Sequence, residues 1–121
     1  MIEPFRLDPH GDLLVGRLAG EVDISQVPVI RDRLYRALDN QDDGLLIDLS
    51  EATYIDSAVV NLLFELADRL GTHQLRLTVV VPEGGLVDRV LAIVDIGSVV
   101  DVYRSYDEAI AALDTGSSAD A

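Results

Sequence analysis

Hydrophobic and polar positions along this chain fall into segments that predict strands and helices in regular succession. Near the N-terminus, the apolar run Leu13–Leu18 follows a first run around Phe5–Leu7, and a cluster of turn residues at Pro9–Asp12 separates them. This pattern predicts a β-hairpin or a close relative of one. From about Gln26, apolar residues recur every three or four positions, as on one face of an amphipathic surface helix: Val27, Ile30, Leu34 and Leu38.

The middle of the chain contains two further runs that predict strands. Leu45–Leu49 is almost continuously apolar, which is typical of a strand that is buried on both faces near the centre of a sheet. Residues Ser50–Ile55 are expected to form a short connector, which leads into a helix that ends near Gly71. Leu75–Val81 is rich in β-branched residues and is followed by Pro82, so it is the strongest strand signal in the chain.

The last part of the chain predicts a third helix, a short strand and a final helix. Apolar residues within 87–94 share one helical face, and Val99–Tyr103 has the composition of a strand. Ser105–Glu108 matches the capping box that opens a helix. The small and polar residues 115–121 predict a disordered C-terminal tail.

The predicted element order is β-β-α-β-α-β-α-β-α, without a repeat or a shift in composition that would mark a second domain. Strands joined by crossover helices favour an α/β fold with a mixed, largely parallel sheet of about five strands and about four helices. A length of 121 residues suffices for one hydrophobic core. We therefore expect a single domain over residues 1–114, followed by the tail at 115–121.

The charge and composition of the chain narrow its partners. The chain has 22 acidic and 9 basic residues, which gives a formal net charge of -13. This charge disfavours direct binding to nucleic acid, because it repels phosphates. The chain has no cysteine, which excludes disulfides and thiolate metal sites and suits a reducing compartment. No apolar stretch approaches the length of a membrane span. We expect a cytoplasmic protein that does not insert into a membrane.

The inventory of residues that could carry catalysis is small. His10 and His73 each stand in a turn without a second histidine at metal-binding spacing. The sequence around Ser57 lacks the glycines of a G-x-S-x-G elbow, and the pair Gly84-Gly85 lacks the spacing of a phosphate-binding loop. We therefore predict that the chain is not an enzyme and binds no metal or other cofactor.

Aspartates recur near predicted strand ends, at Asp23, Asp48 and Asp56. Clustered carboxylates can hold Mg²⁺, as in the receiver domains that are phosphorylated on aspartate. Receiver domains, as a family, also carry a lysine near the end of a late strand, which neutralises the phosphoryl group. This chain has no lysine. Because the broad fork of arginine differs from a compact ammonium group, arginine is a poor substitute. The receiver interpretation is therefore disfavoured.

The pair Asp56-Ser57 stands where the second helix is expected to begin. Both residue types are preferred N-caps, because a side-chain oxygen can accept hydrogen bonds from the free backbone N–H groups of the first turn. Capping alone could explain both residues. The local pattern therefore leaves a structural and a functional role open for this pair.

Two motifs resemble the STAS domain of bacterial anti-sigma-factor antagonists. The sequence LAGEVD at Leu18–Asp23 is similar to the family pattern L-x-G-E-[LIV]-D at the end of the second strand. The sequence IDLSEATYIDS at Ile47–Ser57 resembles the family's strand, connector and Asp-Ser at a helix start. The spacing of the motifs and the order of elements also agree over residues 5–113. The family usually continues Ser-Gly-Leu, whereas here Ala58-Val59-Val60 follows.

The resemblance implies a protein-binding switch controlled by phosphorylation of Ser57. In the family, the partner is an anti-sigma factor with serine kinase activity, which is bound while the serine is unphosphorylated, so that a sigma factor is released. The alternative within the same resemblance is a STAS subunit that is never phosphorylated and serves a transporter or a stress-sensing assembly. The resemblance also implies that Asp23 and Asp56 lie near Ser57 at the binding surface.

The second helix could add a docking flank to this surface. At about 100° per residue, Val60 and Phe64 lie to one side of the apolar stripe, between the buried and the charged faces. An exposed aromatic side chain there could anchor a partner, or both side chains could pack under a neighbouring helix. The residues predicted to contact the partner are Asp23, Asp56, Ser57, Ala58, Val60, Asn61 and Phe64.

Overall fold

The computed structural model describes residues 4–38 and 44–119, with side chains described up to residue 114. Its strands are β1 (Phe5–His10), β2 (Leu13–Val22), β3 (Leu45–Ile55), β4 (Leu77–Val80) and β5 (Asp101–Tyr103). Its helices are α1 (Val27–Leu38), α2 (Ser57–Gly71), α3 (Leu86–Ile93) and α4 (Tyr106–Ala119), with a 3-10 turn η1 (Ile96–Ser98). The predicted order of strands and helices is confirmed.

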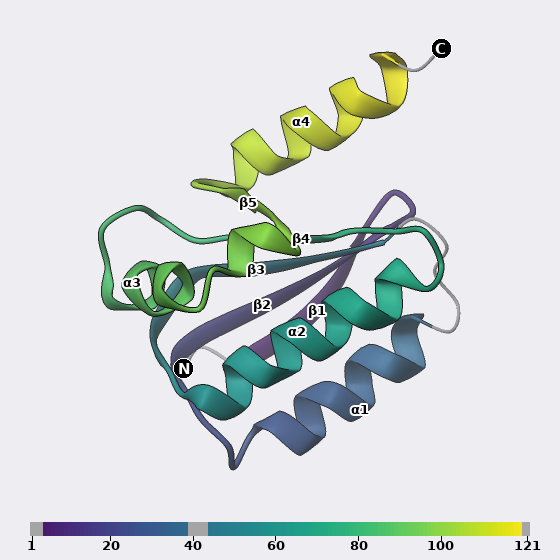
Figure 1. The fold of residues 1–121 in the computed structure, drawn as a ribbon. Coiled ribbons are helices and arrows are strands. Elements are labelled where there is room, and N and C mark those ends of the chain that lie inside the picture. Colours follow the sequence, from purple (N-terminus) through teal and green to yellow (C-terminus); the bar gives the residue numbers. More distant parts are fainter. Residues whose placement is uncertain (1–3, 39–43, 120–121) are drawn as a thin grey trace.

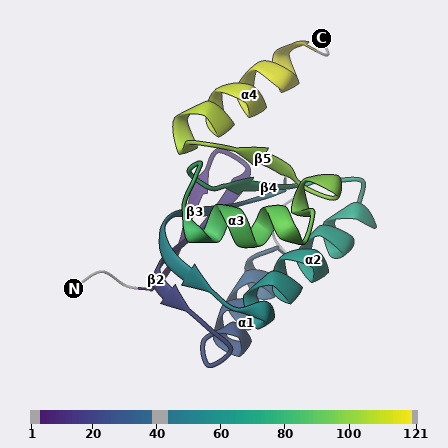
Figure 2. The ribbon, with the colours of Figure 1, turned by 60° about the vertical axis from the view of Figure 1, so that its left-hand side comes forward.

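The strands form one five-stranded sheet in the order β1-β2-β3-β4-β5 (Figure 1). β1 is antiparallel to β2, and the remaining neighbours are parallel, so the predicted mixed and largely parallel sheet is confirmed. Each parallel pair is joined by a helix, and such crossovers share one hand. As a result α1 and α2 lie side by side on one face, whereas α4 lies on the opposite side of the sheet (Figure 1, Figure 2).

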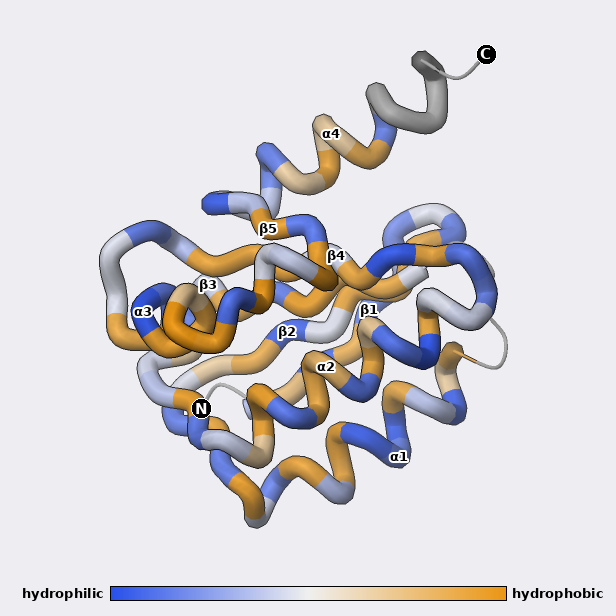
Figure 3. Tube along the Cα trace, in the orientation of Figure 1, coloured by the Kyte–Doolittle hydropathy of each residue, from blue (hydrophilic) through white to orange (hydrophobic). Residues whose placement is uncertain are grey.

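β3 is the middle strand, and alternate residues of its apolar run enter two different clusters. Leu45, Ile47 and Leu49 face the large core under the first three helices, and each is at most 1% exposed. Leu46 points to the other face, where it packs with Val15, Val80 and Ala109, the last of which belongs to α4. Hydrophobic positions accordingly run through the strands and recur at intervals along α1 and α2 (Figure 3). The continuous apolar run thus reflects burial on both faces, as predicted.

The strand β3 is longer than the sequence pattern suggests. Residues Ser50–Ile55, predicted as a connector, continue the strand and pair with the end of β2 up to Val22↔Ile55. The pairing passes two irregularities, and Gly20 next to the second has φ 75, which glycine adopts without strain. The side chains of Ser50–Ile55 are mostly polar and give no strand pattern. The segment is nevertheless a strand, because its backbone pairs with that of β2.

The start of α4 agrees with the predicted capping box, since the Ser105 hydroxyl accepts a hydrogen bond from the Glu108 amide at 3.1 Å. The helix is assigned to Ala119, so helical backbone enters the segment 115–121 that was predicted as a disordered tail. Residues 120–121 lie outside the described residues. A separate tail therefore stays a prediction. No helix among the described residues is long and apolar enough to cross a membrane.

A polar cluster joins α1 to α2 at the outer side of the core. Arg31 donates from Nε and Nη2 to the two carboxylate oxygens of Glu65, at 3.0 Å and 3.2 Å. The Tyr35 hydroxyl also donates to Glu65, and the Arg69 guanidinium lies 4.5 Å from the centre of the Tyr35 ring. The hydrogen bond from Tyr35, aided by Arg31, holds the pKa of Glu65 below its ordinary value. Burial and the nearby carboxylate raise the pKa of Tyr35.

We expect Leu63→Ala to lower the free energy of unfolding by about 2–5 kcal/mol, because the Leu63 side chain is 1% exposed and its removal leaves a cavity. Urea denaturation monitored by circular dichroism measures this change. Asn61→Ala, an exposed position on the same helix, is the control and should stay within about 0.5 kcal/mol of wild type. Equal losses for the two variants would contradict the described core.

The α1–α2 cluster should also make stability depend on acid. A carboxyl whose pKa is lowered by folding stabilises the protein above its unfolded pKa, and that contribution is lost as pH falls through the folded pKa. Glu65→Gln removes the titrating group. Below about pH 5, the free energy of unfolding of this variant should therefore fall less than that of the wild-type protein. Denaturation curves at several pH values measure the difference. Parallel pH profiles for the two proteins would contradict this role of Glu65.

Candidate functional site

The carboxylate of Asp56 connects the start of α2 to the loop that follows β2. One oxygen, Oδ1, accepts hydrogen bonds from the amides of Ala58 at 3.0 Å and Val59 at 3.2 Å, so Asp56 is the N-cap of the helix. The other oxygen, Oδ2, accepts from the amide of Ile24 at 2.9 Å. The predicted capping role therefore belongs to Asp56, and the same side chain also fixes a loop that is distant in sequence.

Asp23 organises that loop, which lies between β2 and α1. Its Oδ1 accepts from the amide of Ser25 at 3.0 Å and from the Ser25 hydroxyl at 2.5 Å. Its own amide donates to the side chain of Gln26 at 2.9 Å. Because Val22 and Ile55 pair across the parallel strands β2 and β3, the residues that follow them, Asp23 and Asp56, leave the sheet at the same edge. The structure thus brings together two of the predicted site residues.

Ser57 is the first residue of α2 and is exposed. Within the part of the chain that the structure describes, its hydroxyl forms no hydrogen bond, because the cap is supplied by the neighbouring Asp56. The N-terminal end of a helix carries partial positive charge from its free N–H groups, which favours a negative group placed there. Ser57 is therefore accessible and stands at the positive end of the helix, beside the Asp56 carboxylate.

Two exposed apolar residues that the sequence analysis missed stand close to Asp23 and Asp56 in the sequence. Ile24 is 68% exposed in the loop that Asp56 holds, and Tyr54 is 42% exposed near the end of β3. Apolar side chains exposed next to polar groups are typical of surfaces that bind proteins. The sequence held a signal for Ile24, which stands between Asp23 and Ser25 and outside the predicted strands and helices.

The flank of α2 is only partly available to a partner. Asn61 is exposed, whereas Ala58 and Phe64 are half-buried and pack against the large core. Val60 is 6% exposed and belongs to that core. Of the two alternatives for this side chain, docking of a partner or packing inside the protein, the structure shows packing. Phe64 lines a groove of about 540 Å³ formed with the end of α2 and the segment after η1, whose lining includes Ala67, Gly71, Arg76 and Val99.

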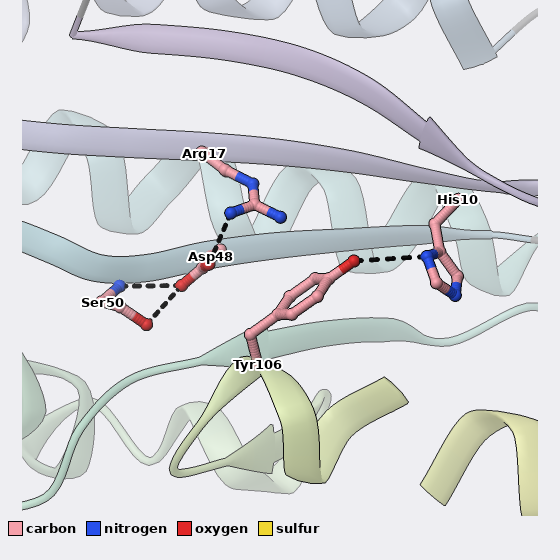
Figure 4. Close-up of polar contacts among 5 residues, drawn as sticks. All are labelled: His10, Arg17, Asp48, Ser50 and Tyr106. Atoms are coloured by element: carbon pink, nitrogen blue, oxygen red, sulfur yellow. Dashed lines mark hydrogen bonds and ion pairs between the residues drawn. The ribbon is translucent and has the colours of Figure 1, made fainter. Parts of the chain in front are cut away.

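Asp48 does not join the carboxylates at the helix start. It is 6% exposed and sits within β3, where Oδ1 accepts from the amide and the hydroxyl of Ser50 at 2.9 Å and 2.5 Å (Figure 4). Its Oδ2 lies 3.9 Å from Nη1 of Arg17, whose guanidinium stacks 4.6 Å from the centre of the Tyr106 ring. His10 faces the Tyr106 hydroxyl at 3.4 Å. Among the described residues, no cluster of His, Asp or Glu could hold a metal ion.

The STAS domain model matches residues 5–109 of this chain. That match spans most of the sequence and includes both strand ends, the loop after β2 and the start of α2. The chain belongs to the STAS domain family. No curated protein sequence is similar enough to the chain to count as a match.

Solved structures with the same fold include an anti-sigma factor antagonist from Mycobacterium paratuberculosis, at 21% identity and TM-score 0.79, covering 91% of this chain and 92% of that one. The anti-sigma factor antagonist SpoIIAA in its unphosphorylated form has 19% identity and TM-score 0.75, covering 93% and 98%. The Bacillus cell fate determinant SpoIIAA in the phosphorylated form has 22% identity and TM-score 0.67, covering 88% and 96%. At these identities the likeness shows the shared fold.

We expect Asp56→Ala to destabilise the protein by about 0.5–2 kcal/mol, because the first turn of α2 loses its cap and the Ile24 amide loses its acceptor. Asp56→Asn should fall between wild type and Asp56→Ala, since one amide oxygen can serve the helix or the loop but not both. Chemical denaturation measures both variants, with the exposed Glu21→Ala as control. Wild-type stability of Asp56→Ala would disprove the described linkage.

Proposed function

We propose that this chain is an anti-sigma-factor antagonist, a phosphorylation-controlled binding switch that acts in the cytoplasm and catalyses no reaction itself. The observation that carries the proposal is the division of roles at the start of α2. Asp56 supplies the cap, so the exposed hydroxyl of Ser57 has no structural task in the described part of the chain. Membership of the STAS family and the names of the similar solved structures support the same reading of the site.

The unmodified protein would present a surface with both polar and apolar contacts to the anti-sigma factor. The carboxylates of Asp23 and Asp56 accept hydrogen bonds from loop and helix amides. These bonds hold the backbone in one conformation in the free protein. Ile24, whose amide is bound to Asp56, adds exposed apolar area beside the start of α2. A preorganised surface loses little conformational entropy on binding. Binding of the anti-sigma factor to this surface would release the sigma factor that it otherwise holds.

Phosphorylation of Ser57 would change this surface and leave the fold intact. A phosphate adds a charge of about -1.5 to -2 at pH 7, and the positive end of α2 tolerates that charge. The amides of Ala58 and Val59 are already bound to Asp56, so the phosphate would add its charge beside a carboxylate. The increased negative potential and the cost of removing water from the phosphate would both weaken the complex.

Incubation with the cognate anti-sigma factor kinase and ATP, followed by intact mass measurement, should add one phosphate to the wild-type chain and none to Ser57→Ala. Ser25→Ala is the matched control, because Ser25 is exposed in the loop that Asp56 holds, and it should be labelled like wild type. Undiminished labelling of Ser57→Ala would refute the assignment. A chain that is never labelled but still binds an assembly would favour the alternative of a non-phosphorylated STAS subunit.

A further inference from the structure

A groove of about 350 Å³ runs between the start of β1 and the outer side of α1. Its floor is formed by Phe5 and Ile30, which are 6% and 3% exposed, and Val29 stands on its rim at 61% exposure. Pro4 lines the groove from the strand side. The groove is therefore an apolar channel open to solvent, with room for an aliphatic side chain between the strand and the helix.

One end of the groove carries a cation. The Arg33 guanidinium lies 4.8 Å from the centre of the Phe5 ring, and it pairs with no carboxylate among the described residues. Its neighbours on α1 differ, because Arg31 is bound to Glu65 and Arg36 to Asp32. In a chain with a formal net charge of -13, an exposed arginine that has no carboxylate partner among the described residues attracts an acidic group.

The other end of the groove joins the surface around Ser57. It is lined by Ser25 and Gln26, which belong to the loop whose Ile24 amide is held by Asp56. Ile24 and Val29 are the exposed apolar side chains on either side of this junction. A partner that covers the start of α2 therefore reaches the groove by following this loop along the outer side of α1.

We propose that the groove binds an extended segment of the anti-sigma factor that carries an aliphatic side chain followed by a carboxylate. The aliphatic group lies over Phe5 and Ile30 against Val29, and the carboxylate pairs with Arg33, whose planar fork suits that geometry. This inference rests on the proposed function and extends its contact surface beyond the start of α2. An acidic segment is repelled by most of this chain, so pairing with Arg33 sets the register of the complex.

Binding of the cognate anti-sigma factor, measured by isothermal titration calorimetry, tests the groove. Arg33→Glu and Val29→Asp should each weaken binding at least about tenfold, because each places a negative charge where a carboxylate or an aliphatic side chain binds. The loss for Arg33→Glu should shrink at high salt. Arg36→Glu makes the same change in charge one turn beyond the groove and should bind like wild type within about twofold. Circular dichroism checks that all variants are folded.

Ser57→Asp separates the failure of this inference from the failure of the proposed function. If Ser57→Asp abolishes binding while Arg33→Glu and Val29→Asp bind like wild type, the switch stands and the groove is overturned. Equal losses for Arg33→Glu and Arg36→Glu would show a diffuse effect of charge and would also overturn it. A change of oligomeric state in the groove variants would make the occupant a second copy of this chain. If the wild-type chain forms no complex, both proposals fall.

Discussion

The arrangement of the site depends on one carboxylate, that of Asp56, which accepts hydrogen bonds from three backbone amides. Two of them belong to the first turn of α2, and the third belongs to Ile24 in the loop after β2. Backbone amides at a helix start have no partner within the helix, so a carboxylate there satisfies them and complements the helix dipole. The same carboxylate holds the loop, which is why Ile24 and the exposed Ser57 both lie at the start of α2.

The parallel pairing of β2 with β3 makes this contact available. Because Val22 and Ile55 are partners in the ladder, β2 and β3 end at the same edge of the sheet and lead into α1 and α2. The strand β3 in turn is held in place from both faces, by the large core on one side and by the residues under α4 on the other. A central strand packed on both faces thus leads directly into the start of α2, where the proposed modification takes place.

The sequence predicted the architecture well because the signals that define it are local. Alternating or continuous apolar runs located all five strands, and the three- to four-residue spacing located the helices. A cap from the pair Asp56-Ser57 followed from residue type and position, and the structure assigned it to Asp56. Residues Ser50–Ile55 were misassigned, since their polar side chains give no strand pattern and their pairing is decided by β2. For Val60, helical geometry alone could not decide between docking and burial, and the neighbouring elements bury it.

The sequence by itself determined the fold class, the charge and the place of Asp56-Ser57 at a helix start, because these depend on composition, periodicity and adjacent residues. Only the tertiary structure decided which side chains meet. It separated Asp48 from the carboxylates at the sheet edge, joined Asp56 to Ile24, and left Arg33 beside an open groove. These outcomes follow from strand register and helix packing, which place residues that are distant in the chain within hydrogen-bonding distance and which no local pattern specifies.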